Sequence, residues 1–106
     1  MVDQDVVSVV RRYLGVLPEF GIHASRAVLF GSFAVDKADE WSDIDLIAIA
    51  PEFDEPYDIT FVERLWSARI TDSRIEPIPC GEREWETDGG RPILEVARIE
   101  GITIAA

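Results

Sequence analysis

Two short apolar runs, each bordered by residues that can do chemistry, constrain the fold of this chain most strongly. Residues 26–30 (RAVLF) stop abruptly at Gly31-Ser32, and residues 43–49 (DIDLIAI) begin with two alternating acids. Runs of this length that are rich in apolar residues and bounded by turn signals are typical of buried strands. We therefore predict two strands of a sheet, the first ending in a tight turn and the second beginning with Asp43 and Asp45 on one face.

The segments around these strands predict a small sheet with helices. Apolar residues at three- and four-residue spacing predict helices from the N-terminus to about residue 17 and over 58–70. Residues 74–80 have room for a strand, and their two prolines favour an edge position. We also expect a short helix and loop over 34–41, short helices over 81–87 and 92–99, and a last strand over 102–104. The predicted fold class is α/β (α+β), one domain over 1–106 with a small mixed sheet and helices on one face.

Charge excludes two classes of partner. The chain has 106 residues, with 21 acids against 10 lysines and arginines, for a formal net charge of -11. Such a chain repels phosphate backbones and anionic lipid, so we expect neither direct nucleic-acid binding nor membrane binding. The single cysteine, Cys80, an acidic N-terminus and no apolar run near 20 residues together favour a cytoplasmic protein.

The turn and the acids predict a site for a metal and a nucleotide. Gly31 lets an anion approach the backbone, and Ser32 adds a hydroxyl, so the pair suits phosphate groups. Asp43 and Asp45 repel each other unless a cation lies between them, and Mg²⁺ takes one or two carboxylates together with phosphate oxygens. A third carboxylate completes such a site or accepts the proton of an attacking hydroxyl. We choose Glu76 on the predicted third strand, with Asp72 as the second candidate.

These residues resemble a known signature. Residues 29–34 (LFGSFA) followed by 42–46 (SDIDL) are similar to the motif of the polymerase-β-type nucleotidyltransferase superfamily, and the length is similar to its minimal nucleotidyltransferase (MNT) branch. The resemblance implies transfer of a nucleoside monophosphate from ATP or another NTP onto a hydroxyl, with Mg²⁺. It assigns Gly31 and Ser32 to phosphate binding, Asp43 and Asp45 to the metal, and Glu76 to the third metal-binding and catalytic carboxylate.

The turn departs from that motif after Ala34. The family often continues with arginine and glycine, whereas this chain has Val35 and Asp36, and Lys37 is the nearest cation. One alternative is therefore a degenerate protein that keeps the fold and binds its partner without chemistry. A small-molecule, antibiotic-type nucleotidyltransferase is a second alternative, and a plain structural partner with solubilising acids is a third.

The resemblance also implies a partner. Stand-alone MNT proteins pair with helical HEPN-domain proteins, often as antitoxin and toxin, and the MNT protein neutralises the HEPN ribonuclease. An acidic antitoxin suits a basic partner, because opposite potentials favour encounter. We expect a hetero-complex of this kind or a homo-oligomer, with the acceptor hydroxyl supplied by another molecule. Of the tryptophans, we expect Trp66 in the core, Trp41 packed in its loop rather than stacked on a base, and Trp85 in the core or on a partner surface.

Overall fold

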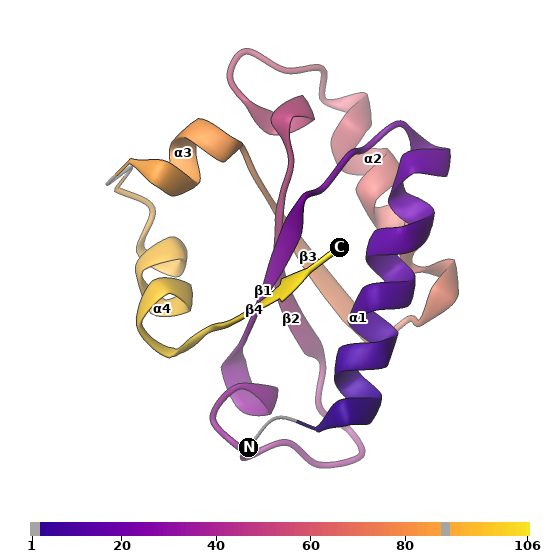
Figure 1. Ribbon diagram of the computed structural model, residues 1–106, viewed down its shortest axis with the longest axis vertical. Helices are drawn as coiled ribbons and strands as arrows, with labels where there is room; N and C mark the ends of the chain where they lie inside the picture. The colour runs from indigo at the N-terminus through magenta and orange to yellow at the C-terminus, as the bar shows by residue number, and fades with distance from the viewer. Residues whose placement is uncertain (1–2, 88–89) are drawn as a thin grey trace.

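The sheet has four strands and is mixed, as the sequence predicts. The computed structural model describes residues 3–87 and 90–106. In chain order the helices and strands are α1 (Gln4–Val16), β1 (Arg26–Phe30), β2 (Ile44–Ile49), α2 (Thr60–Ser67), β3 (Ile75–Cys80), α3 (Glu82–Glu86), α4 (Pro92–Glu100) and β4 (Ile102–Ala105) (Figure 1). The strand order is β3-β2-β1-β4. Strand β1 is antiparallel to β2 and β4, whereas β2 and β3 are parallel, which places the proline-containing β3 at an edge.

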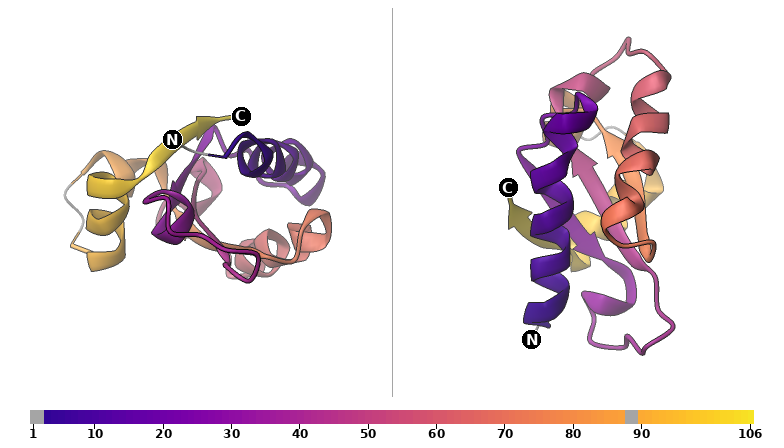
Figure 2. Two further views of the ribbon diagram at one scale, coloured as in Figure 1. Left: turned by 90° about the horizontal axis from the view of Figure 1, so that it is seen from below. Right: turned by 90° about the vertical axis from the view of Figure 1, so that its right-hand side faces the viewer.

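Helices cover both faces of the sheet, so the expectation of helices on one face is wrong. Figure 2 shows α1 and α2 on one side of the strands and α3 and α4 on the other. The two faces carry separate apolar clusters, because successive side chains along a strand point to opposite faces. Leu29 and Leu46 belong to the cluster under α1 and α2, whereas Val28 and Ile47 pack with Leu94 of α4. The strands β1 and β2 are apolar on both faces for this reason.

Helix α1 begins at a side-chain cap, and a glycine ends the turn that follows the helix. Asp3 caps it, since its side chain accepts a hydrogen bond from the Asp5 N–H at 2.8 Å. Gly21 ends the following turn in the left-handed region, at φ 81°. The buried stripe consists of Val6, Val7, Val10, Tyr13 and Leu14. Burial of this stripe against the sheet compensates for the weak helix propensity of valine.

Two predicted helices differ in the structure. Residues 34–41 form turns rather than a short helix, and the only helical turn nearby is a 3-10 turn over Gly31–Phe33. Asp36 explains the difference, because its φ of 59° interrupts a right-handed helix. The helix expected over 58–70 is α2 followed by a 3-10 turn at Ala68–Thr71. In the part of the chain that the structure describes, no helix has the length and apolarity that crossing a bilayer requires.

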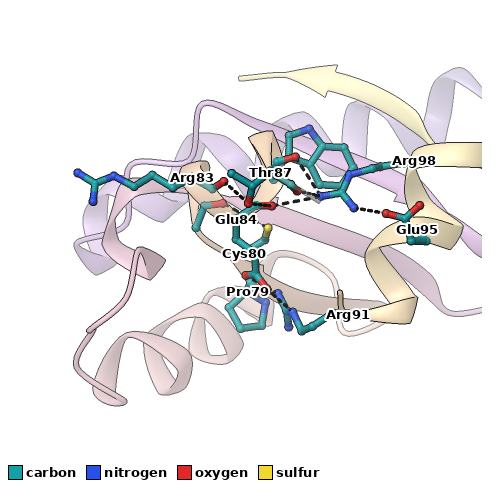
Figure 3. Close-up of polar contacts among 10 residues, drawn as sticks. Pro79, Cys80, Arg83, Glu84, Thr87, Arg91, Glu95 and Arg98 are labelled. Atoms are coloured by element: carbon teal, nitrogen blue, oxygen red, sulfur yellow. Dashed lines mark hydrogen bonds and ion pairs between the residues drawn. The ribbon is translucent and has the colours of Figure 1, made fainter. Parts of the chain in front are cut away.

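Arginines join α3, α4 and β3 into one unit (Figure 3). The Arg91 guanidinium binds the Glu84 carboxylate at 2.7 and 2.9 Å and the Pro79 carbonyl at 2.8 Å. The Arg98 guanidinium donates to the carbonyls of Glu84, Trp85 and Thr87 at 3.0 to 3.2 Å. Because carbonyls at the end of a helix lack partners within the helix, Arg98 satisfies the C-terminal end of α3.

Replacing Arg98 should therefore destabilise the protein without touching the candidate site. We expect Arg98→Met to lower the free energy of unfolding by about 2 kcal/mol, since it removes charge-assisted hydrogen bonds to half-buried carbonyls. Urea denaturation followed by circular dichroism measures this change. Arg11→Met, at an exposed position of α1, is the matched control and should change the free energy by less than about 0.5 kcal/mol.

Candidate active site

The strand pairing brings the three predicted carboxylates to one end of the sheet. Asp45 is the second residue of β2, and its Cα is paired with Phe30 in β1 and with Glu76 in β3. Its neighbours Ile44 and Leu46 are buried under α1 and α2. Asp45 therefore faces the opposite side of the sheet, and Glu76 lies next to it in the adjacent parallel strand.

These carboxylates line one open hollow. Its volume is about 430 Å³, and it is lined by Asp43, Asp45, Glu76, Trp66, Pro77 and Ile78. Asp43 precedes β2 and is exposed, whereas Asp45 and Glu76 are half-buried. The structure thus brings together the three acids that the sequence singles out, although their roles as ligands remain predictions.

Trp66 is also part of the wall of this hollow, which corrects its expected place in the core. It is 39% exposed, whereas its neighbour Leu65 is fully buried against the sheet. The Arg69 guanidinium stacks on the indole at 4.5 Å from the ring centroid. Sequence reasoning missed this residue because it assigned Trp66 to the buried stripe of its helix. The spacing of Ile59, Trp66 and Ile70 along the chain marks a second, exposed apolar stripe.

Gly31 joins the predicted phosphate turn to the acids. Its φ is 73°, in the left-handed region that side chains rarely adopt. A Cβ atom at this position would overlap the Oδ2 atom of Asp45. Glycine is therefore required for two reasons: the backbone has a positive φ, and the Asp45 carboxylate leaves no space for a side chain. Ser32 follows in the same 3-10 turn, and the first N–H groups of a helical turn have no partner within the turn.

The electrostatics of the hollow favour a bound cation. The pKa of Asp45 is raised above its usual value by burial first, and then by the negative charges of Asp43 and Glu76. A divalent cation would relieve this repulsion, and carboxylate oxygens are the ligands that Mg²⁺ prefers. The residues present therefore fit Mg²⁺. Within residues 3–87 and 90–106, no group of three or more acidic, histidine or cysteine side chains is already close enough to hold an ion.

This pKa shift predicts that Asp45 lowers the stability of the metal-free protein. The pKa of Asp45 is higher in the folded state than in the unfolded state, so the folded state binds more protons at pH values between the two. As pH rises through this range, Asp45 therefore lowers the free energy of unfolding of the metal-free protein. We expect Asp45→Asn to raise the metal-free melting temperature at pH 7. The gain should disappear below about pH 3, where Asp45 is largely protonated in both states. Scanning calorimetry at the two pH values measures it, and a lower melting temperature at pH 7 would contradict the assignment.

Asp72, the second candidate for the third carboxylate, is engaged elsewhere. Its carboxylate accepts hydrogen bonds from the Arg74 N–H at 2.9 Å and from the Arg74 guanidinium at 2.8 and 3.0 Å. The side-chain hydrogen bond to Arg74 is the main reason that the pKa of Asp72 lies below its usual value. Asp72 therefore fixes the turn before β3, and it does not line the hollow.

Val35 and Asp36, which depart from the family motif, are compatible with the backbone conformation of the turn. Asp36 has a φ of 59°, and aspartate is among the side chains that tolerate this left-handed conformation, for which glycine is otherwise best suited. Val35 and Asp36 are both exposed.

Trp41 is 85% exposed, so the expected packing of this ring in its loop is wrong. Cys80, in contrast, is buried, and burial raises the pKa of its thiol to about 11.

Comparison with protein families decides the class of this site. A family model described as "Nucleotidyltransferase domain" matches residues 10–86. The chain belongs to this nucleotidyltransferase domain family. The match contains the glycine-serine turn, Asp43, Asp45 and Glu76, and it ends within α3. A search of curated proteins finds no match.

The family membership gives the chain its general chemistry, which is nucleotidyl transfer. The mixed sheet and its helices form a nucleotidyltransferase core, as the sequence predicts. Proteins of this family generally use an NTP and a divalent metal ion. The turn after β1, the acids of β2 and the acid of β3 follow one another across the sheet, in the strand order β1, β2, β3. A substrate that extends across this end of the sheet meets them in the same order.

Proposed function

We propose that this nucleotidyltransferase transfers a nucleoside monophosphate, most simply AMP from ATP, onto a hydroxyl of a partner protein. The shared hollow of Asp43, Asp45 and Glu76 carries the proposal, since burial and the charges of Asp43 and Glu76 raise the pKa of the half-buried Asp45. When bound, Mg²⁺ would neutralise charge on the phosphates and stabilise the attacking and leaving oxygens. Asp43 and Asp45 would hold it, with Glu76 as the third carboxylate.

The residues of the chain have separate roles in this reaction. The Gly31-Ser32 turn binds the β and γ phosphates of the NTP, because its backbone allows close approach of an anion. Glu76 either completes the metal site or accepts the proton of the attacking hydroxyl. That hydroxyl attacks the α-phosphorus, the bond from the α-phosphorus to the bridging oxygen breaks, and pyrophosphate leaves.

Charge and exposed apolar residues support a protein as the acceptor. Residues 36–55 contain eight acids and one lysine, with five acids before or at the start of β2 and three after its end. Both ends of β2 therefore present an acidic surface that attracts a basic partner. Large apolar side chains are exposed as well, among them Trp41 at 85%, Ile70 at 86% and Ile99 at 85%. Trp41 lies within the acidic segment, so an apolar contact is available beside the charges that attract a basic partner. We propose that the partner is a helical HEPN-type toxin in the cytoplasm and that this protein is its antitoxin.

A second candidate is an antitoxin that binds without catalysis. The observation that favours it is the turn after β1, where Val35 and Asp36 supply no cation to a triphosphate and add a negative charge. Both forms of antitoxin would use the same acidic surface. They differ only in whether neutralisation of the partner requires the carboxylates of the hollow.

Co-expression with the product of the neighbouring gene separates these candidates. Growth is measured for cells that express that product alone, with the wild-type chain, or with Asp43→Asn/Asp45→Asn. Rescue by the wild type alone supports catalytic neutralisation, and rescue by both chains supports binding without catalysis. The control variant is Glu40→Gln/Glu55→Gln, which removes two exposed acids. It loses the same charge as Asp43→Asn/Asp45→Asn, so it separates loss of the acids in the hollow from a general loss of negative charge. If the wild type rescues no growth inhibition, the antitoxin role is wrong.

A further inference from the structure

Trp66 borders the hollow on the side opposite to the phosphate turn. The order across the sheet is Gly31-Ser32 after β1, Asp45 in β2, Glu76 in β3, and then the edge of the sheet. Trp66 comes from α2, on the other face, and reaches the same hollow beside the edge strand β3 together with Pro77 and Ile78. The wall beyond Glu76 is therefore apolar, whereas the rest of the hollow is acidic.

In-line displacement determines which substrate group reaches this wall. In nucleotidyl transfer the attacking and leaving oxygens lie on opposite sides of the α-phosphorus. The Gly31-Ser32 turn binds the leaving pyrophosphate in the proposed function, on which this inference rests. With pyrophosphate at the turn, the attacking hydroxyl would approach from the Glu76 side, and the group that carries the hydroxyl would lie on the side of Trp66.

The indole is held in place for such a contact. The Arg69 guanidinium stacks on it, 4.5 Å from the ring centroid. The same guanidinium donates hydrogen bonds to the carbonyls of Ser73 and Ile75, just before Glu76. Arg69 thereby ties the ring to β3 and leaves part of it open, since Trp66 remains 39% exposed. A ring fixed in advance loses little conformational entropy when a ligand binds.

We propose that Trp66, with Pro77 and Ile78, forms the acceptor subsite and stacks against a flat apolar group next to the accepting hydroxyl. Flat rings stack on indole with a gain beyond that expected from the buried area alone. The subsite would select acceptors whose hydroxyl adjoins such a group over those with a small aliphatic hydroxyl. Trp66 is then a residue that determines specificity, whereas the nucleotide is held at the other end of the hollow.

The three tryptophans provide a direct test by NMR, since each contributes one indole N–H signal. The signals are assigned with single Trp→Phe variants. Mg²⁺ with tripolyphosphate and Mg²⁺ with α,β-methylene ATP are added separately to show whether the nucleoside affects Trp66. p-Cresol, which is an aromatic hydroxyl, and ethanol are then titrated into the nucleotide complex. We expect saturable shifts of the Trp66 signal with p-cresol and none with ethanol. The Trp85 signal, from α3 beyond the far end of β3, should stay unchanged.

Saturation transfer to p-cresol gives a second readout. Trp66→Ala should weaken p-cresol binding roughly three- to tenfold, as expected for the loss of one stacked ring, and Trp66→Phe should retain most of it. If the nucleoside shifts Trp66 and p-cresol does not, the ring binds the base and this inference is wrong. It is also wrong if p-cresol leaves Trp66 unshifted or binds Trp66→Ala equally well. Failure of both phosphate ligands to bind would instead overturn the proposed function.

Discussion

Asp43→Asn/Asp45→Asn is expected to lower the affinity for Mg²⁺ with α,β-methylene ATP about 100-fold or more. Both carboxylates line the hollow, and the variant removes Asp43, which precedes β2, and Asp45, its second residue. Without them the repulsion between nucleotide phosphates and Glu76 has no bound cation to compensate it. The side chains keep their size, so the fold should remain.

Thermal denaturation converts this loss into a stability difference. At a ligand concentration 100 times the wild-type Kd, binding adds about 2.7 kcal/mol to the stability of the wild type. A variant with 100-fold weaker affinity gains only about 0.4 kcal/mol under the same conditions. The control Glu40→Gln/Glu55→Gln removes the same charge from exposed positions and should keep the wild-type gain. Equal gains for the two double variants would contradict the metal site.

Gly31→Ala adds a single methyl group to the site and should strongly lower both the stability and the nucleotide binding of the protein. It forces a side chain into the left-handed region, which costs about 1–2 kcal/mol. Its Cβ would also overlap Asp45 Oδ2, so the carboxylate has to move away from the turn. We expect a loss of about 2–4 kcal/mol in the free energy of unfolding and loss of nucleotide binding with it.

Gly90 supplies the matched control for this substitution. It also has a positive φ, 83°, but a Cβ there would meet no atom of the described chain within 4 Å. Gly90→Ala should therefore show the backbone cost alone. In Asp45→Ala the overlapping oxygen is absent. Adding Gly31→Ala to this variant should therefore lower the free energy of unfolding by about as much as Gly90→Ala lowers that of the wild type. If Gly31→Ala and Gly90→Ala are equally destabilised, Asp45 does not lie over the turn.

The sheet and the location of the acids could be predicted from the sequence because their signals are local. Apolar runs of strand length and the alternation of Asp43 and Asp45 reflect the length and period of a β-strand. The two prolines indicate an edge strand because proline has no backbone N–H to donate to a neighbouring strand. The positive φ of Gly31 has the same local origin, since the turn must begin where β1 ends. Glu76 next to Asp45 was a choice among acids, and the parallel register of β2 and β3 supports it.

The features that sequence reasoning missed depend on packing between distant segments. Helix α4 and Trp85 cover the second face of the sheet, and nothing local in residues 92–99 indicates which face they choose. The place of Trp66 depends on which of two apolar stripes on α2 turns inward, and Leu65 and Ala68 are the buried ones. A short helix over 34–41 was expected, but the left-handed Asp36 excludes it, and aspartate alone is a weak signal of that conformation.

Transfer of label from ATP tests the central claim most directly. The chain is incubated with Mg²⁺, the product of its neighbouring gene, and ATP labelled with ³²P at either the α or the γ position. Nucleotidyl transfer predicts that the partner acquires label from α-labelled ATP alone, that pyrophosphate is released, and that Asp43→Asn/Asp45→Asn transfers none. Label from the γ position, or equal transfer by the double variant, would contradict nucleotidyl transfer from the hollow of Asp43, Asp45 and Glu76.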